Sequence, residues 1–327
     1  MAHLSEKENY FRMFRGEVPE YVPWGYNFGW SVAPPFFGPR MGEDYTDLFG
    51  VKMIQESKSG PIPEPGKFIL DDIRKWRDII KRPAILDEID WPSQAKKDLD
   101  NRDPELPRTG WVGMGNGYFM NLTYFMGFTN ALIACLEEPE EVKDLMNFLL
   151  DLNLELGKNL IEHYKYDLVT LGDDIAHEHG PFVSEAVFMD LFEPMWRQNV
   201  AIFREADIYA EHHNCGKIEP FIKHIVNMGF NSWGPAQRSN DLAAIKREYD
   251  SKFIISGGFE NNGFVSWPET TQEEVRAEVR HVMDELAPGG GFAFGGFIMG
   301  GPEYSDVNLR NEWIRDEYEK NKFKYYS

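Results

Sequence analysis

The second half of the chain alternates between short apolar segments and longer amphipathic ones, and this rhythm limits the fold more than any other feature. We expect strands to begin near residues 167, 207, 230, 253 and 292, with one helix in each gap between them. Such a repeat is typical of right-handed βαβ units, which place their strands in one parallel sheet. The sequence therefore predicts an α/β fold.

Two architectures fit this pattern, a closed (β/α)8 TIM barrel and an open doubly wound sheet. Space for further units before residue 165 favours the barrel, and so does the absence of a Gly-x-Gly-x-x-Gly sequence after any expected strand. No linker divides the chain, so we expect a single barrel domain over residues 1–327. Its first part, residues 1–110, is expected to form an irregular, aromatic-rich extension with an N-terminal helix and loops that cover the barrel mouth.

Three helical segments can be placed before the repeat begins. Ser5 and Glu8 form a capping box and Gly16 supplies a stop, which predicts a short helix that we expect to be peripheral. Between residues 65 and 108, only residues 71–80 have a convincing helical pattern. From Pro139 to Tyr164, apolar residues recur at helical period and predict a long amphipathic helix.

Charge and composition narrow the possible partners. The chain carries 34 basic and 54 acidic side chains, a formal net charge of −20, and 14% of its residues are aromatic. Nucleic acids, anionic membrane surfaces and polyanionic substrates would be repelled, whereas a small ligand in a pocket lined with rings fits. Two cysteines and the absence of a leader sequence or an apolar span predict a cytoplasmic protein.

Reactive side chains of a parallel barrel gather where its strands end and the next loops begin. His213 and Cys215 lie at such a point, two residues apart, and imidazole with thiolate is a pair that favours zinc. Both can face one metal ion if the chain turns at Asn214. The alternative interpretation is that Cys215 is a small buried hydrophobe and that one histidine belongs to the core.

The acidic loop after the preceding strand can complete a metal site. Its candidate ligands are Asp173, Asp174, His177 and Glu178. Asp174 and His177 are candidates for proton transfer. One of the two adjacent aspartates is expected to cap a helix or turn instead.

Further site candidates come from other loops. Glu260 follows two glycines in a turn, and these allow close approach of the backbone to a ligand, so we assign it a catalytic role. The residues that we expect to bind substrate come mainly from the aromatic segment near the N-terminus, and they are Trp24, Tyr26, Asn27, Trp30 and Gln237.

Several segments together carry a resemblance to a known family: residues 172–174, 180–184, 213–216, 235–237, 255–260 and 288–291. In order and spacing they resemble the uroporphyrinogen decarboxylase superfamily, strongly from residue 165 onward and weakly over residues 40–110. The resemblance implies a (β/α)8 barrel. It also implies one of two activities, tetrapyrrole decarboxylation or corrinoid-dependent methyl transfer.

The methyltransferase branch resembles the chain better than the decarboxylases do. The decarboxylases hold the carboxylates of their substrate with an arginine-rich N-terminal motif, and residues 24–30 contain no arginine. The His-x-Cys motif of the methyltransferase branch corresponds to His213 and Cys215 as zinc ligands. Members of this branch that act on thiols have a later cysteine ligand, which residues 295–301 lack, so the third ligand must come from elsewhere. We choose Glu178 and keep Asp173 and His177 as alternatives.

The resemblance therefore implies the methyltransferase component of an O-demethylase. Such an enzyme depends on zinc and moves a methyl group from a small methoxylated, aromatic compound to the Co(I) corrinoid (cobalamin) of a separate protein. A carboxylate ligand makes zinc a stronger Lewis acid, which suits an ether oxygen. Two alternatives stay open: a metal-free decarboxylase acting on a smaller acid, and a non-catalytic barrel that binds a tetrapyrrole or a corrinoid protein. Monomer and homodimer are both compatible with the sequence.

Overall fold

A parallel sheet of six strands forms the centre of the molecule. The computed structural model describes residues 3–25, 32, 34, 40, 42–56, 60–100, 102–114, 117–261, 263–298 and 306–326. Neighbouring strands of the sheet pair in parallel in the order β11, β10, β9, β8, β5, β4. Their bounds are β4 (Thr109–Trp111), β5 (Leu168–Gly172), β8 (Tyr209–His213), β9 (Ser232–Ala236), β10 (Ile254–Gly258) and β11 (Phe292–Gly295). The five strands expected from the sequence are confirmed.

The N-terminal segment connects the two edges of this sheet. At one edge Trp24 forms a parallel bridge with Phe294 of β11, and the N–H of Gly25 donates to the Phe294 carbonyl at 2.6 Å. At the other edge the N–H of Val32 donates to the Thr109 carbonyl of β4 at 2.8 Å. One short stretch of chain therefore reaches both edges, as the (β/α)8 barrel requires.

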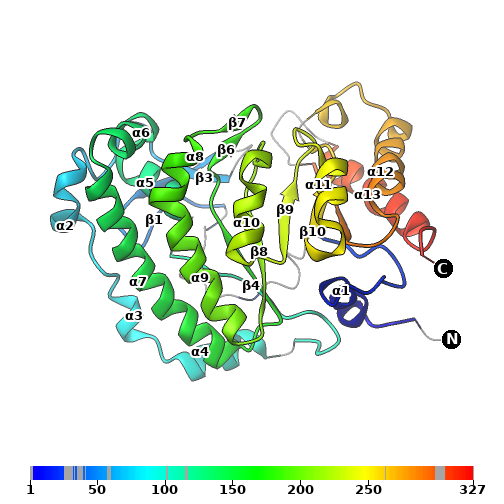
Figure 1. Ribbon diagram of the computed structural model, residues 1–327, viewed down its shortest axis with the longest axis horizontal. Coiled ribbons are helices and arrows are strands. Elements are labelled where there is room, and N and C mark those ends of the chain that lie inside the picture. Colours follow the sequence, from blue (N-terminus) through cyan, green and yellow to red (C-terminus); the bar gives the residue numbers. More distant parts are fainter. Residues whose placement is uncertain are drawn as a thin grey trace.

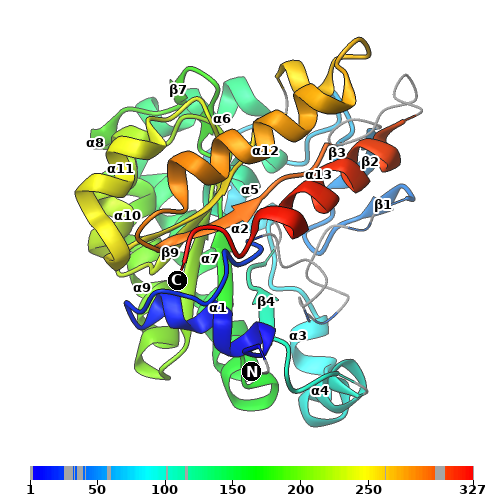
Figure 2. The same cartoon turned by 90° about the vertical axis from the view of Figure 1, so that its right-hand side faces the viewer.

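Helices cover the outer face of the sheet (Figure 1). After β5 come α8 (Glu185–Val187), a π-helical turn η2 (Phe188–Phe192) and α9 (Glu193–Glu205), and the later helices are η3 (Glu219–Phe221), α10 (Ile222–Met228), α11 (Leu242–Tyr249), η4 (Asp250–Lys252), η5 (Phe264–Ser266), α12 (Gln272–Leu286) and α13 (Val307–Asn321). Local signals set some of these bounds. Thr271 and Glu274 form a full capping box at the start of α12, and α10 ends at Gly229. Figure 2 shows α12 and α13 side by side.

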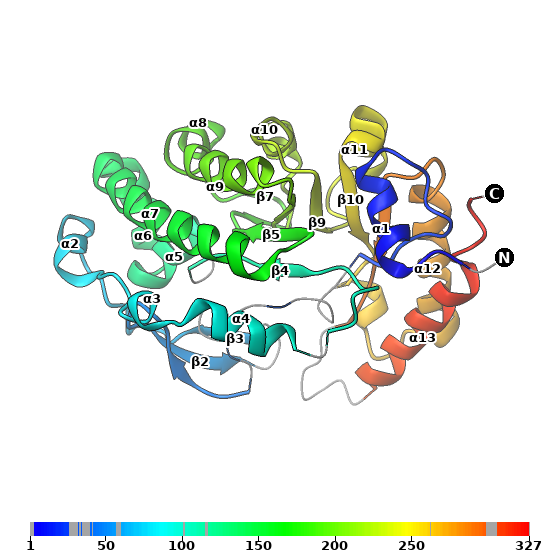
Figure 3. The same ribbon diagram turned by 90° about the horizontal axis from the view of Figure 1, so that it is seen from below.

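The first helix, α1 (Glu6–Phe14), is not peripheral. Ser5 caps it as expected, by accepting a hydrogen bond from the N–H of Glu8 at 3.2 Å. Its side chains Tyr10, Phe11 and Met13 are buried in one cluster with Leu168, Ile254 and Ala293, which stand at or near the beginnings of three barrel strands. Figure 3, seen from below, shows α1 at this end of the molecule. The helix therefore closes the lower end of the barrel.

The segment between residues 65 and 108 contains more helix than its pattern predicts. The expected helix appears as η1 (Ile73–Lys75) and α2 (Trp76–Ile79), and α3 (Ile85–Glu88) and α4 (Trp91–Leu99) follow it. Asp90 caps α4 by accepting from the N–H of Ser93, and the helix buries Trp91 and Ala95. Only two of its residues are buried, so its apolar stripe is too narrow to stand out in the sequence.

The remaining elements lie outside the central sheet. The strands β1 (Tyr45–Thr46), β2 (Lys52–Glu56) and β3 (Gly60–Pro63) form a small antiparallel sheet. The long helix α7 (Pro139–Tyr164) has the bounds expected for it, and α5 (Tyr118–Met126) and α6 (Phe128–Glu137) precede it. In the described part of the chain no single helix has the length and apolar character to cross a membrane, and α5 and α6 satisfy that test only as a pair bent by 112°. The expectation of a single domain stays a prediction.

Candidate metal centre

Three potential metal ligands meet at the upper end of two neighbouring strands. Asp174 follows β5, His213 is the last residue of β8, and Cys215 lies two residues beyond it. The ligand atoms of these side chains all lie within 4.8 Å of one another. His213 Nε2 is 3.7 Å from Asp174 Oδ1 and 3.9 Å from Cys215 Sγ. We call Asp174, His213 and Cys215 the ligand cluster.

The turn after β8 is fixed by hydrogen bonds to the loop after β5. The N–H of Cys215 donates to Asp174 Oδ1 at 2.7 Å, and the side chain of buried Asn214 donates to the carbonyl of Asp173. Trp233 Nε1 donates to the Asn214 carbonyl at 3.0 Å. The chain turns at Asn214, and the turn brings the thiol and the imidazole to the same place.

Gly216 and Gln237 support this turn from the other side. Gly216 has φ +78°, and a Cβ there would lie 2.7 Å from the His177 carbonyl oxygen, so only glycine fits without displacing the backbone. The side-chain oxygen of Gln237 accepts a hydrogen bond from the N–H of Gly216. Gln237, which we expected to bind substrate, therefore braces the loop that carries Cys215.

Asp173 has a structural role. Its carboxylate accepts hydrogen bonds from the N–H groups of Tyr118, Phe119 and Met120, at 2.9, 2.6 and 2.8 Å, and so caps the N-terminus of α5. Burial raises the pKa of Asp173 to about 7, although the three amide donors act in the opposite direction. We expected one aspartate of the pair to cap a helix or turn, and Asp173 does so. The helix that it caps, α5, precedes it in the chain.

The electrostatic environment of the ligand cluster suits a cation. Burial lowers the pKa of His213, and the nearby Asp174 opposes this effect only in part, so the imidazole is neutral and can bind a metal. Burial and Asp174 both raise the pKa of the Cys215 thiol. Among the described residues, no lysine or arginine forms an ion pair with Asp174. A cation bound there would pair with the Asp174 carboxylate and would favour the thiolate form of Cys215.

The donor set and its spacing fit zinc. Nitrogen, sulfur and carboxylate oxygen are the atoms that bind zinc in proteins, at about 2.0–2.3 Å, which places the ligands of a tetrahedral site roughly 3.3–3.7 Å apart. The two separations from His213 Nε2, 3.7 and 3.9 Å, are close to that range, and the atoms of Asp174 and Cys215 lie within 4.8 Å of each other. Three protein ligands leave one position open for a substrate, as in catalytic zinc sites. Trp111 of β4 lies edge to face against His213, with ring centroids 4.8 Å apart, and so helps to fix the imidazole.

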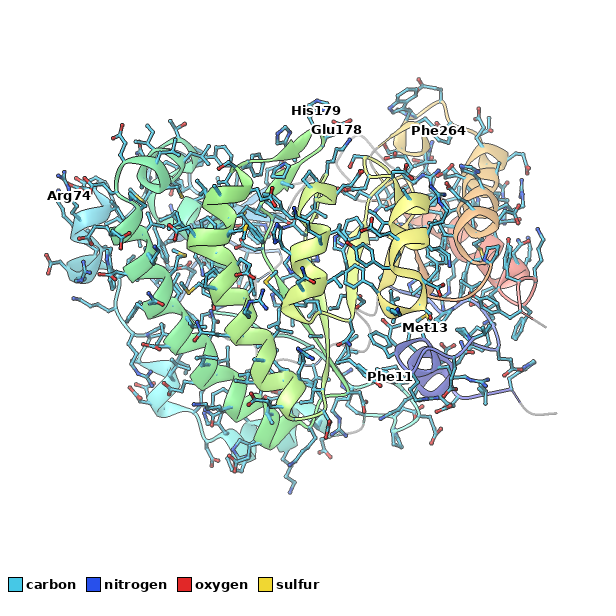
Figure 4. The ribbon with its side chains drawn as sticks, viewed as in Figure 1. Phe11, Met13, Arg74, Glu178, His179 and Phe264 are labelled. Atoms are coloured by element: carbon cyan, nitrogen blue, oxygen red, sulfur yellow. The ribbon has the colours of Figure 1, made fainter. Side chains whose placement is uncertain are left out.

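Glu178, our choice for the third ligand, is not part of the ligand cluster, and Asp174 lies in its place. Glu178 is exposed on the hairpin of β6 (Ala176–His177) and β7 (Gly180–Pro181). Figure 4 shows Glu178 and His179 at the outer end of this hairpin, far from Phe11 and Met13. The short antiparallel pairing of β6 with β7 carries Glu178 to the turn and away from the barrel. His177 is exposed as well, and its ring stacks on Phe182 at 5.0 Å.

Glu260 and Trp24, two further predicted site residues, are not part of the ligand cluster. Glu260 lies in the loop after β10. The pKa of Glu278 on α12 is raised mainly by burial and to a smaller extent by the negative charge of Glu260. The Trp24 ring packs edge to face against Phe294 and Tyr318, 5.4 and 4.8 Å away, between β11 and α13. Tyr26, Asn27 and Trp30 lie outside the described residues.

Two residues that line the barrel interior were not selected from the sequence, Trp111 and Glu211. Tyr209, Glu211 and His213 alternate along β8 with the buried Ala210 and His212. His212 packs against Trp196 and Phe230 in the outer layer, so it is the core histidine of the pair. This alternation assigns Glu211 to the same face as His213, a signal that the sequence contains. Burial raises the pKa of Glu211 to about 7.

Comparison with known proteins assigns the family. The family model described as uroporphyrinogen decarboxylase (URO-D) matches residues 46–298, which is more than half of the chain. The chain belongs to the uroporphyrinogen decarboxylase family. The family assignment agrees with the resemblance of the strand-end motifs and with the barrel.

A solved structure resembles this member of the uroporphyrinogen decarboxylase family over almost the full length of the chain. A methyltransferase from Methanosarcina mazei is 11% identical and has a TM-score of 0.70, with 97% of this chain and 99% of that chain covered. At that identity the match establishes a shared fold. A dihydropteroate synthase from Anaplasma phagocytophilum is 17% identical over 55% of this chain and 70% of its own, with a TM-score of 0.36, too low to carry an argument. No curated protein sequence matches the chain significantly.

Proposed function

We propose that this protein is a zinc-dependent methyltransferase that takes a methyl group from a small methoxylated aromatic compound and passes it to the Co(I) corrinoid of a separate protein. The observation that carries the proposal is the ligand cluster of nitrogen, sulfur and oxygen donors at the barrel mouth, without a cationic partner among the described residues. The shared fold with a protein described as a methyltransferase supports it.

Asp174, His213 and Cys215 would hold the zinc ion. Bound there, zinc supplies Lewis acidity that draws electrons from an ether oxygen and weakens its bond to the methyl carbon. Asp174 also accepts the N–H of Cys215 at 2.7 Å, so the same carboxylate would fix the loop that carries the thiolate. Trp111 holds the His213 ring from the side and gives the site one aromatic wall.

The transfer requires a methyl acceptor and a proton. The methyl carbon leaves the ether oxygen for cobalt, both electrons of the new bond come from the Co(I) acceptor, and a phenolate keeps the electrons of the broken bond. The phenolate then takes up a proton. We propose that His177 donates this proton. Its backbone carbonyl lies against the turn at Gly216, and its side chain is exposed. Tyr26, Asn27 and Trp30 stay proposed contacts to the aromatic ring, and Glu260 a proposed catalytic group.

Decarboxylation, the alternative, has less support. A decarboxylase acting on an acid needs positive charge to hold the substrate carboxylate. The described part of the chain places no lysine or arginine in an ion pair with the ligand cluster, and the net charge of −20 disfavours anionic substrates.

The proposal is tested by a methyl-transfer assay. Zinc-loaded protein is incubated with methoxybenzene or a methoxyphenol and with free cob(I)alamin in place of the corrinoid protein, and methylcobalamin is measured by its absorbance. We expect methylcobalamin with the wild type and at least a hundredfold slower formation, in order of magnitude, with Cys215→Ala, because the ether oxygen is then no longer polarised. Release of CO2 from aromatic acids by metal-free protein, with no methyl transfer, would contradict the proposal.

A further inference from the structure

The described strands place polar side chains, small residues and one aromatic ring in the barrel interior below the ligand cluster. The strand register defines one row across four strands, which contains Trp111, Thr170, Glu211 and Ser232. The row above it contains Gly172, His213 and Gly234. Layers of bulky branched side chains normally fill such an interior. Here Thr170, Glu211 and His213 keep part of their surface accessible, although they lie on central strands.

Glu211 is the acidic residue of this row. The hydroxyl of Ser232 donates to Glu211 Oε2 at 3.1 Å, and the hydroxyl of Ser256 on β10 also bonds to the carboxylate. No lysine or arginine among the described residues pairs with it. A carboxylate has about four lone-pair sites, and two serines occupy two of them. An acid held this deep without a cation is costly to the fold, which is typical of a group kept for a ligand.

The distance between Glu211 and the ligand cluster limits the size of a ligand that can contact both. Glu211 and His213 are two residues apart on the same face of β8, roughly 6.6 Å along the strand, which is comparable to one substituted aromatic ring. A ring with its methoxy oxygen at the ligand cluster would therefore direct its other end toward Glu211. The Trp111 ring lies beside both rows.

We propose that Glu211, supported by Ser232 and Ser256, binds a hydroxyl group of the methyl donor and so selects methoxyphenols over methoxyarenes without a hydroxyl. This inference rests on the proposed function. The carboxylate accepts a hydrogen bond from the ligand hydroxyl. The O–H groups of Ser232 and Ser256 already bond to the carboxylate, so the hydroxyl that can donate to the ligand oxygen is that of Thr170 in the same row. An ammonium group has no acceptor site for that hydroxyl, so a phenol satisfies the row better than a cation does.

The experiment measures equilibrium binding to the zinc-loaded protein by isothermal titration calorimetry. The probes are methoxybenzene and 2-, 3- and 4-methoxyphenol, which share the methoxy group and differ in the hydroxyl. We expect at least one methoxyphenol to bind about tenfold or more tightly than methoxybenzene, as a hydrogen bond to a charged group implies. Glu211→Gln should remove this difference and leave the affinity for methoxybenzene and the zinc content unchanged.

Matched variants keep the test decisive. Glu205→Gln makes the same chemical change at an exposed position of α9 and should retain the preference for the methoxyphenol. If Glu211→Gln does not fold, Ser256→Ala removes one bond to the carboxylate and should reduce the preference by a smaller factor, about threefold.

The possible failures are distinguishable. Equal affinity of the wild type for all four probes, or equal weakening of all of them by Glu211→Gln, would overturn the role of Glu211 and leave the proposed function intact. Failure of every probe to bind, together with an absence of methyl transfer, would instead contradict the proposed function.

Discussion

Two adjacent aspartates, Asp173 and Asp174, serve different parts of the molecule. Asp173 points to the first N–H groups of α5, and Asp174 points to Cys215 and His213. A Cβ at Gly117, before α5, would lie 2.8 Å from the Asp173 carboxyl carbon, so the backbone approaches this aspartate closely. The cap therefore fixes the backbone from which Asp174 extends, so the stability of this loop and the geometry of the ligand cluster are coupled.

The capping role makes a direct prediction about stability. Asp173→Ala leaves three N–H groups of α5, two of them buried, without an acceptor and should lower the free energy of unfolding by about 2–3 kcal/mol. Urea denaturation followed by far-UV circular dichroism measures this loss. Asp100→Ala, at an exposed aspartate, should change stability by less than about 0.5 kcal/mol. Equal denaturation midpoints for the two variants would rule out the cap.

At the level of residues, local pattern and tertiary placement contribute differently to the site. His213 and Cys215 could be selected from the sequence because their spacing at a strand end is local information. The choice between Asp174 and Glu178 could not be made, since it depends on the pairing of β6 with β7, which takes Glu178 to an exposed turn. Glu211 could have been found, because it alternates with His213 along a strand that the sequence predicted.

At the level of elements, α1 is a structural part of the barrel. It contributes Tyr10, Phe11 and Met13 to a buried cluster at the beginnings of barrel strands, whereas the ligand cluster lies at and after the ends of β5 and β8. The sequence indicated its bounds through the capping signal at Ser5. It could not indicate its location, because the cluster pairs α1 with strands more than 150 residues away in the chain.

This location predicts how the loss of a buried side chain of α1 affects the stability of the fold. Phe11→Ala should lower the free energy of unfolding by about 3–4 kcal/mol, because it leaves a cavity at the barrel floor, and it should not change the zinc content. Phe264→Ala, at a side chain 38% exposed near the other end, should cost about 1 kcal/mol or less. Thermal or urea unfolding compares the two variants. A larger loss for Phe264→Ala would contradict the role of α1 as a barrel floor.

The elements that could be predicted from the sequence have a strong local pattern of apolar residues. The strands β5, β8, β9, β10 and β11 were found because each is a short run enclosed between a helix and a turn, and α7 because its apolar stripe is broad. Helix α4 was missed because only Trp91 and Ala95 of its nine residues are buried. A narrow buried stripe in a charged segment gives too weak a periodic signal.

At the scale of the whole molecule, the two ends of the barrel have separate tasks. The lower end is closed by α1 and its apolar cluster, and the upper end holds the ligand cluster between the loops after β5 and β8. Between them lies the row of Trp111, Thr170, Glu211 and Ser232. The lower end therefore serves stability, and we propose that the middle recognises the methyl donor and that methyl transfer takes place at the mouth.

The central claim is that Asp174, His213 and Cys215 bind zinc. The most direct measurement is the zinc content per chain of protein purified without chelator, for the wild type and for Asp174→Ala, His213→Ala, Cys215→Ala and Glu178→Ala, with circular dichroism to verify folding. We predict about one zinc ion per chain in the wild type and in Glu178→Ala, and loss of zinc in the other three variants. Stoichiometric zinc in the folded Asp174, His213 and Cys215 variants would contradict the account.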